Sequence, residues 1–172
     1  FIVGSGLLVH QKYFGTLIRA FSLVRIKKNC KLIILGEGAL LDSLSSLASE
    51  LNILNDVEFV GFVSNPYPFY YHSDVFVLSS IFEGFGNVLI EAIACNCKIV
   101  STDCPYGPSD ILENGKWGNL TEVSNVEAMA DAILNKLSKP VDDNIAARAL
   151  DFNISDVYKE YESVCFGPIK DC

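Results

Sequence analysis

Residues Ser79 to Ala94 read S-S-I-F-E-G-F-G-N-V-L-I-E-A-I-A, and this stretch decides the fold. An apolar run, Asp74 to Leu78, precedes it, and Gly84 and Gly86 fall in the middle of it. From Asn87 onward, apolar residues recur at helical spacing. The stretch therefore predicts a strand, a loop and a helix in succession.

The start of this helix predicts an anion-binding site. Amides of a first helical turn have no partner within the helix, and the positive end of the helix dipole favours phosphate there. Glu83 precedes the helix and Glu91 lies one turn inside it. Side chains on a helix lean toward its N-terminus, so we expect both carboxylates to face one bound molecule. Amides that hold an anion, with acids that accept from hydroxyls, fit a sugar nucleotide.

The remaining chain alternates strands with helices. We expect strands at 1–3, 31–35, 57–60, 74–78 and 98–101, with a weak last strand ending near Leu120. We expect helices at 13–24, 40–48, 65–72, 87–94, 108–112 and 126–137, and one or two more within 142–164. Strands of nearly continuous Val, Ile and Leu indicate a parallel sheet covered on both faces, an α/β doubly wound, Rossmann-like domain.

Ligands of such sheets bind at the carboxyl ends of strands, near the point where strand order reverses. Several candidate segments directly follow predicted strands: Lys12, Gly36 to Gly38, Val63 and Glu83 to Asn87. We therefore expect one pocket to collect them. Lys12 either reaches a diphosphate or is a solvated lysine, and its sequence neighbours favour neither. Glu91 is flanked by apolar residues, and a buried carboxylate requires a partner.

Composition narrows the class of protein. The chain has 172 residues, of which 50% are hydrophobic and 20% charged, as in an ordinary globular domain. A net charge of -8 argues against nucleic acid as a partner. No apolar run approaches the roughly 20 residues of a membrane span. The chain begins at Phe1 within an expected strand and without Met, so we interpret residues 1–172 as one domain of a longer protein.

No metal site is expected. The six cysteines, at positions 30, 95, 97, 104, 165 and 172, match no zinc-binding spacing and indicate reduced thiols. His10 and His72 have no partner at metal-ligand spacing. The aromatic run from Tyr67 to Tyr71 is interpreted as core packing rather than base stacking, and Gly36-Glu37-Gly38 does not form a dinucleotide fingerprint.

Five blocks of sequence carry a resemblance to a known family: G-x-x-x-x-Q-K from Gly6 to Lys12, L-G-E-G from Leu35, V-G-F-V-S-N-P-Y-P from Val60, E-G-F-G-N-V-L-I-E-A from Glu83, and T-D-C-P-Y-G-P-S-D-I-L from Thr102. Together they resemble the C-terminal donor-binding domain of retaining GT-B glycosyltransferases of the family-four type, also called group 1. The likeness is closest to members that build bacterial surface polysaccharides, lipopolysaccharide cores and lipid-linked oligosaccharides.

The resemblance implies roles for individual residues. Glu83 and Glu91 match the glutamates of the Glu-x7-Glu motif, which contact the donor sugar and the ribose. Lys12 matches the lysine on the diphosphate, and Val63 matches a position beside the base. The implied catalytic residues are Glu83 and Lys12, and the implied donor-binding residues are Lys12, Val63, Glu83, Gly84, Phe85, Gly86, Asn87, Val88 and Glu91.

Two positions depart from the family pattern. Leu7 replaces the usual arginine that follows the first glycine, so Lys12, Arg19 or another residue would have to carry that charge. Asn96 replaces a glycine, and asparagine is the best substitute for glycine in a left-handed turn.

The resemblance implies a retaining, metal-independent transferase without a cofactor, which moves a hexosyl or N-acetylhexosaminyl group from a nucleotide sugar, with UDP as the nucleotide. The acceptor, a glycan or lipid-linked molecule, would bind an N-terminal domain absent from this chain, so the isolated chain should be inactive. The expected location is the cytoplasm, with peripheral contact to the inner face of the membrane. A sugar-nucleotide hydrolase or epimerase, and a non-catalytic Rossmann-like module with a decayed site, remain open alternatives.

Overall fold

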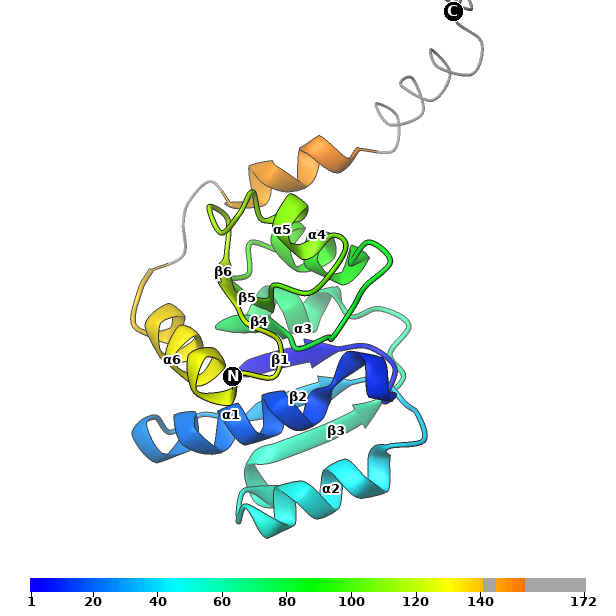
Figure 1. Cartoon of the computed structure of the whole chain (residues 1–172), viewed down its shortest axis with the longest axis vertical. Helices are drawn as coiled ribbons and strands as arrows, with labels where there is room; N and C mark the ends of the chain where they lie inside the picture. The colour runs from blue at the N-terminus through cyan, green and yellow to red at the C-terminus, as the bar shows by residue number, and fades with distance from the viewer. Residues whose placement is uncertain (141–144, 154–172) are drawn as a thin grey trace, which may run out of the picture.

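The computed structural model describes residues 1–140 and 145–153, which contain a six-stranded parallel sheet (Figure 1). The strand order is β3-β2-β1-β4-β5-β6, so the chain winds outward in one direction from β1 and then in the other from β4. This confirms the doubly wound α/β prediction. The strands are β1 (Ile2–Ser5), β2 (Leu32–Leu35), β3 (Val57–Gly61), β4 (Val75–Leu78), β5 (Ile99–Thr102) and β6 (Asn119–Thr121).

Helices cover both faces of the sheet (Figure 1). One face carries α1 (Phe14–Lys27), α2 (Leu41–Glu50) and α6 (Val126–Leu137), with α1 packed between the other two. The opposite face carries α3 (Tyr67–His72), α4 (Asn87–Ala94), α5 (Pro108–Ile111) and a 3-10 helix, η3 (Ile145–Phe152). Two shorter 3-10 turns are η1 (His10–Lys12) and η2 (Leu54–Asp56).

Each face of the sheet has its own apolar core. Alternate strand residues point to opposite faces, so Ile2 of β1 packs under α1 whereas Val3 packs under α4. Ile2 also pairs with Leu32 of β2 and with Val75 of β4, which makes β1 the centre of the sheet. The connections after β1 and β4 leave toward different neighbours, and this opens a crevice at the carboxyl ends of these two strands.

Most predicted elements are confirmed to within one or two residues, and three details differ. The segment before α1 contains the turn η1 instead of a continuous loop. Helix α3 begins at Tyr67 rather than Asn65, and the Asn65 side chain accepts the Tyr67 amide at 3.3 Å. Of the helices expected within 142–164, the structure describes η3, and the rest of that range lies outside the described residues.

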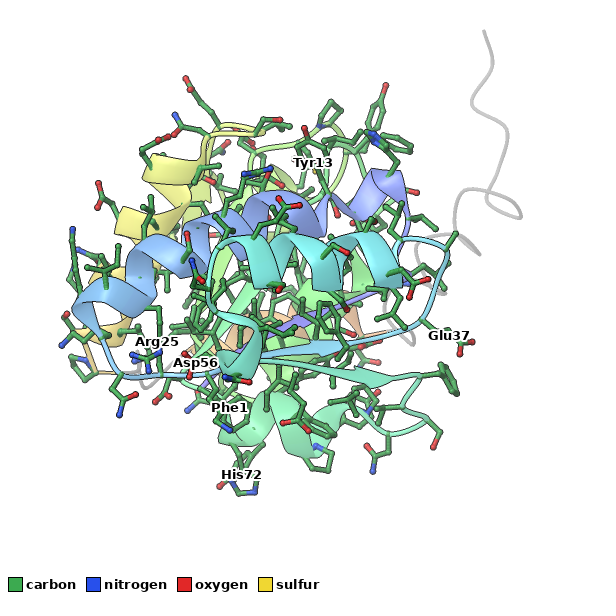
Figure 2. All side chains as sticks on the ribbon, turned by 90° about the horizontal axis from the view of Figure 1, so that it is seen from below. Phe1, Tyr13, Arg25, Glu37, Asp56 and His72 are labelled. Atoms are coloured by element: carbon green, nitrogen blue, oxygen red, sulfur yellow. The ribbon has the colours of Figure 1, made fainter. Side chains whose placement is uncertain are left out.

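Several features lie remote from the crevice. His72 lies at the surface, and Arg25 of α1 pairs with Asp56 at 2.9 Å (Figure 2). Asn96 has a φ of 59°, the left-handed conformation expected of it. The four described cysteines, at positions 30, 95, 97 and 104, are free thiols. Within the described ranges, no helix has both the length and the apolar character needed to cross a bilayer.

Candidate functional site

A cavity of about 230 Å³ lies at the crevice where strand order reverses. Its walls come from the carboxyl ends of β1 and β2, the loop from β3 to α3, and α3 and α4. The lining residues are Ser5, Gly6, Leu7, Leu35, Gly36, Glu37, Phe62, Val63, Pro66, Tyr70, Val88 and Glu91. The cavity thus lies at the carboxyl ends of the strands as predicted, but Lys12 and residues 83–87 are not part of its wall, so one pocket does not collect all the predicted segments.

Three polar side chains meet within this cavity: Ser5 from β1, Tyr70 from α3 and Glu91 from α4. Burial raises the pKa of the Glu91 carboxyl above its ordinary value. Burial also raises the pKa of Tyr70 to about 12; the nearby Ser5 hydroxyl opposes this shift and the Glu91 charge adds to it. Among the residues that the structure describes, the Tyr70 hydroxyl has no hydrogen bond of ordinary geometry. This part of the cavity offers the Glu91 carboxylate to a ligand with hydroxyl groups, while the Tyr70 hydroxyl is buried behind the cavity wall.

Two large apolar side chains stand exposed at the cavity wall. Leu7 is 60% exposed and Phe62 is 73% exposed. Glu37 is also part of the wall, but its side chain points outward into solvent (Figure 2). Exposed apolar surface at a cavity favours a planar or apolar group of a ligand.

Lys12 and Glu83 form an ion pair beside the cavity. The Lys12 ammonium donates to Glu83 Oε1 at 2.7 Å and to Oε2 at 2.9 Å. Glu83 is only 6% exposed. Gly6, which lines the cavity, packs against the aliphatic part of the Lys12 side chain. The lysine left undecided by its sequence neighbours therefore has a carboxylate partner, brought to it by the loop after β4.

Hydroxyl groups fix the loop that carries Glu83. Ser80 Oγ donates to Glu83 Oε1 at 2.5 Å, and Thr102 Oγ1 of β5 donates to the Ser80 carbonyl at 2.6 Å. Ser79 Oγ donates to the Lys12 carbonyl at 2.8 Å. The loop is thus tied to the neighbouring strand on one side and to the Lys12 segment on the other.

Close backbone contacts between loops set the shape of the site. A Cβ placed on Gly107 would lie 1.7 Å from the Phe85 carbonyl oxygen, and Gly107 has a φ of 99°. A Cβ on Gly36 would lie 2.0 Å from the Gly6 carbonyl oxygen. Only glycine permits such approaches, so both glycines serve the positions of the loops they touch.

Helix α4 directs its uncapped N-terminus toward this region. Gly86 precedes the helix with a φ of 97°, and no side chain caps it. The Leu89 amide donates back to the Gly86 carbonyl at 2.8 Å, so the amides of Asn87 and Val88 mark the open end. Phe85 packs edge to face on Phe152 of η3 with ring centroids 5.8 Å apart, which supports the loop from outside.

The predicted site residues fall into two neighbouring groups. Val63, Val88 and Glu91 line the cavity, whereas Lys12 and Glu83 pair beside it. The sequence predicts that Glu83 and Glu91 face one bound molecule; in this structure Glu91 lines the cavity, whereas Glu83 pairs with Lys12 beside it. Gly84, Phe85 and Asn87 are exposed between the two groups, and Gly86 forms the turn into α4. Arg19 is exposed on α1 and is not part of the cavity wall.

Sequence reasoning missed Ser5, Phe62, Tyr70 and Ser80. Tyr70 does pack in the core against Phe76, with ring centroids 5.3 Å apart, as the interpretation of the aromatic run implied. Tyr70 nevertheless also lines the cavity, which the sequence pattern does not reveal. Ser80 lies three residues before Glu83, and this short spacing was a signal that could have been followed. Within the described part of the chain, no group of three His, Cys, Asp or Glu residues is placed to hold a metal ion.

Comparisons of the sequence with protein families and with known proteins both identify glycosyltransferases. A family model described as glycosyl transferases group 1 matches residues 1–150. Over 137 residues the chain is 41% identical to the N-acetylgalactosamine-N,N'-diacetylbacillosaminyl-diphospho-undecaprenol 4-alpha-N-acetylgalactosaminyltransferase of Campylobacter jejuni, covering 80% of this chain and 37% of that protein.

Solved structures share the fold. A variant of S. aureus TarM, crystallised with fondaparinux, alpha-GlcNAc-glycerol and UDP, superposes with a TM-score of 0.77 at 31% identity, over 96% of this chain and 34% of that one. The C-terminal domain of the Francisella tularensis protein LpcC, crystallised as a separate domain, superposes with a TM-score of 0.69 at 23% identity, over 94% of this chain and 86% of that one.

Proposed function

The chain belongs to the group 1 glycosyltransferases, and from this premise we propose that it is the donor-binding domain of a retaining, metal-independent enzyme that uses a UDP-sugar. The observation that carries the proposal is the pairing of Lys12 with Glu83 directly beside a cavity that contains Glu91. A cation for a diphosphate and two carboxylates for hydroxyls are thereby gathered at the crevice of a doubly wound sheet.

The nucleoside part of the donor fits the cavity. Its base meets the apolar side chains of Leu7 and Phe62 and lies beside Val63, while the ribose hydroxyls donate to Glu91. A carboxylate that accepts from two vicinal hydroxyls gains the partners that its burial demands. UDP is the favoured nucleotide because S. aureus TarM, 31% identical to this chain, was crystallised with it.

The diphosphate lies at the open end of α4. The amides of Asn87 and Val88 and the helix dipole attract the anion, and Lys12 adds a full positive charge. As the bond to the sugar breaks, negative charge grows on the departing UDP, and donors already in place stabilise it without reorganisation. This assigns the role of a metal ion to the protein's own groups. Leu7 brings no charge, so Lys12 carries the role of the missing arginine.

Donor binding exchanges partners at the ion pair. When Lys12 turns to the diphosphate, the oxygens of Glu83 become available to hydroxyls of the donor sugar. Glu83 then orients the sugar toward the acceptor, which is positioning and not proton transfer. An orientation that presents the same face of the sugar to both leaving group and acceptor supports retention of configuration.

The acceptor is assigned to another part of the protein. The chain spans 37% of the Campylobacter relative and 34% of the TarM chain, so the complete enzyme is expected to hold its acceptor on an N-terminal domain. The Campylobacter enzyme's name describes transfer to an undecaprenol-linked glycan. We extend this to a glycan or lipid-linked acceptor, met at the cytoplasmic face of a membrane by peripheral contact. This chain alone should bind the donor and transfer nothing.

The test is calorimetric titration of the chain with UDP, uridine, GDP, NAD and several UDP-sugars. Lys12→Ala should weaken UDP binding by about tenfold or more, the size of a charge-assisted hydrogen bond, and leave uridine binding unchanged. Glu91→Ala should weaken both ligands. Arg19→Ala, which removes an exposed cation of α1, is the control and should change neither.

Two outcomes would refute the proposal. If UDP shows no saturable binding, or if both site variants bind it as well as the wild-type chain, the decayed-module alternative replaces the donor domain. A complete protein that releases free sugar from a UDP-sugar without any acceptor would instead favour the hydrolase.

A further inference from the structure

Ser80 lies directly beside the ion pair of Lys12 and Glu83. It is fully buried at the end of β4, with an exposed fraction of 0%. Its hydroxyl donates to Glu83 Oε1 at 2.5 Å, and its carbonyl accepts from Thr102 Oγ1 at 2.6 Å. The Ser80 backbone is thus hydrogen-bonded to β5, while the Ser80 side chain is hydrogen-bonded to the Glu83 carboxylate.

Lys12 and Ser80 share the same oxygen of Glu83. The ammonium reaches Oε1 at 2.7 Å and the hydroxyl reaches it at 2.5 Å. Glu83 is 6% exposed, so water solvates its carboxylate only slightly. If the ammonium leaves, the carboxylate loses both hydrogen bonds from Lys12 and stays buried, and an unpartnered buried charge is strongly unfavourable.

We infer that Ser80 is a positioning residue: its hydroxyl keeps one hydrogen bond to the Glu83 carboxylate and holds it in place while Lys12 moves to the diphosphate. The inference rests on the proposed function, since it assumes that Lys12 binds the diphosphate. Ser80 is fully buried and acts through Glu83, without touching the ligand itself. It therefore affects the binding of ligands that recruit Lys12 and leaves other ligands unaffected.

UDP and uridine separate these two kinds of ligand. Both place a nucleoside in the cavity, but only UDP carries the diphosphate that draws Lys12 from Glu83. Ser80→Ala should weaken UDP binding by about tenfold, the effect of losing one hydrogen bond to a charged group, and change uridine binding by less than about twofold. Ser80→Cys fills the space of the serine with a weak donor and should show the same loss.

Two further variants complete the experiment. In a Glu83→Gln background, no buried carboxylate loses its partner when Lys12 moves to the diphosphate. Adding Ser80→Ala to this background should therefore change UDP affinity by less than about twofold. Ser101→Ala is the matched control: Ser101 is equally buried, and its hydroxyl donates to the Thr102 carbonyl at 2.9 Å, away from Glu83. It should bind UDP and uridine as the wild-type chain does.

The outcomes distinguish this inference from the function on which it rests. A wild-type chain that fails to bind UDP overturns the donor site itself. A chain that binds UDP, but whose affinity is unchanged by both Ser80 substitutions, overturns only the role of Ser80. The same is true if Ser80→Ala costs as much in the Glu83→Gln background, or if uridine and UDP lose affinity equally, because Ser80 would then serve general packing.

Discussion

Gly107→Ala is expected to disable the site from outside it. A Cβ on Gly107 would lie 1.7 Å from the Phe85 carbonyl oxygen, and 3.0 Å is the shortest approach that real Cβ atoms show. The loop must therefore retreat by more than about 1 Å, in the overpacked range that costs about 1–3 kcal/mol. A φ of 99° adds backbone strain of about 1–3 kcal/mol for a residue with a side chain.

Together these effects predict a loss of about 2–6 kcal/mol in the free energy of unfolding. For a domain of this size each kcal/mol lowers Tm by about 2–4 °C, so a fall of about 4–24 °C is expected by scanning calorimetry. Because Phe85 lies two residues before Asn87, the shift also carries the open end of α4 away from its ligand. UDP affinity should fall at least about tenfold at a temperature where the variant is still folded, since site geometry tolerates displacements near 1 Å poorly.

Gly115→Ala separates the contact from the backbone strain. Gly115 has nearly the same φ, 96°, but the nearest atom to a Cβ placed there would be the Gly118 carbonyl oxygen at 3.6 Å. This control should lower Tm through strain alone and leave UDP affinity unchanged. Equal Tm values for the two variants, together with intact UDP binding by Gly107→Ala, would refute the view that this glycine sets the position of the loop.

Two further predictions concern stability. Gly15 lies in α1, where a Cβ would meet only Leu47 Cδ2 at 3.8 Å. Gly15→Ala should therefore raise the free energy of unfolding, measured by urea titration, by about 0.5–1 kcal/mol. A decrease would contradict this account of the helix. Burial raises the pKa of Glu91, so its charge opposes folding once the pH exceeds the ordinary value of 4.5. Glu91→Gln should therefore be more stable than the wild-type chain at pH 8, with the gain fading below pH 4.5; a difference independent of pH would argue against desolvation as the cause.

The sequence was sufficient to predict the strands of the sheet and the region of the fold in which the candidate site lies. Apolar runs and helical spacing are local signals, so α6 was predicted at its observed bounds, Val126–Leu137. The principle that ligands bind at the carboxyl ends of parallel strands placed Val63 at the crevice, and the lean of side chains toward a helix N-terminus placed Glu91 near the ligand, before any contact was known. What decides such predictions is information carried within a dozen neighbouring residues.

The contacts that give the site its chemistry join distant segments. Lys12 and Glu83 are 71 residues apart, and no spacing rule connects a residue after β1 with one after β4. The bare sequence therefore left Lys12 undecided, and it did not predict that Glu83 pairs with Lys12. Gly107 against Phe85 is a similar case, because its sequence neighbours give no reason for a glycine there.

The order of the strands also dictates when the site comes into being. Every adjacent pair in this sheet is parallel, so no tight hairpin starts the assembly, and β1 must find β4 across two intervening strand and helix units. Closing so large a loop is entropically costly and slow compared with forming any single helix. The ion pair spans this closure, with its lysine after β1 and its glutamate after β4. The ion pair of the proposed donor site thus forms only once the two halves of the sheet have joined, and a nucleotide bound there, as proposed, would stabilise that union by mass action.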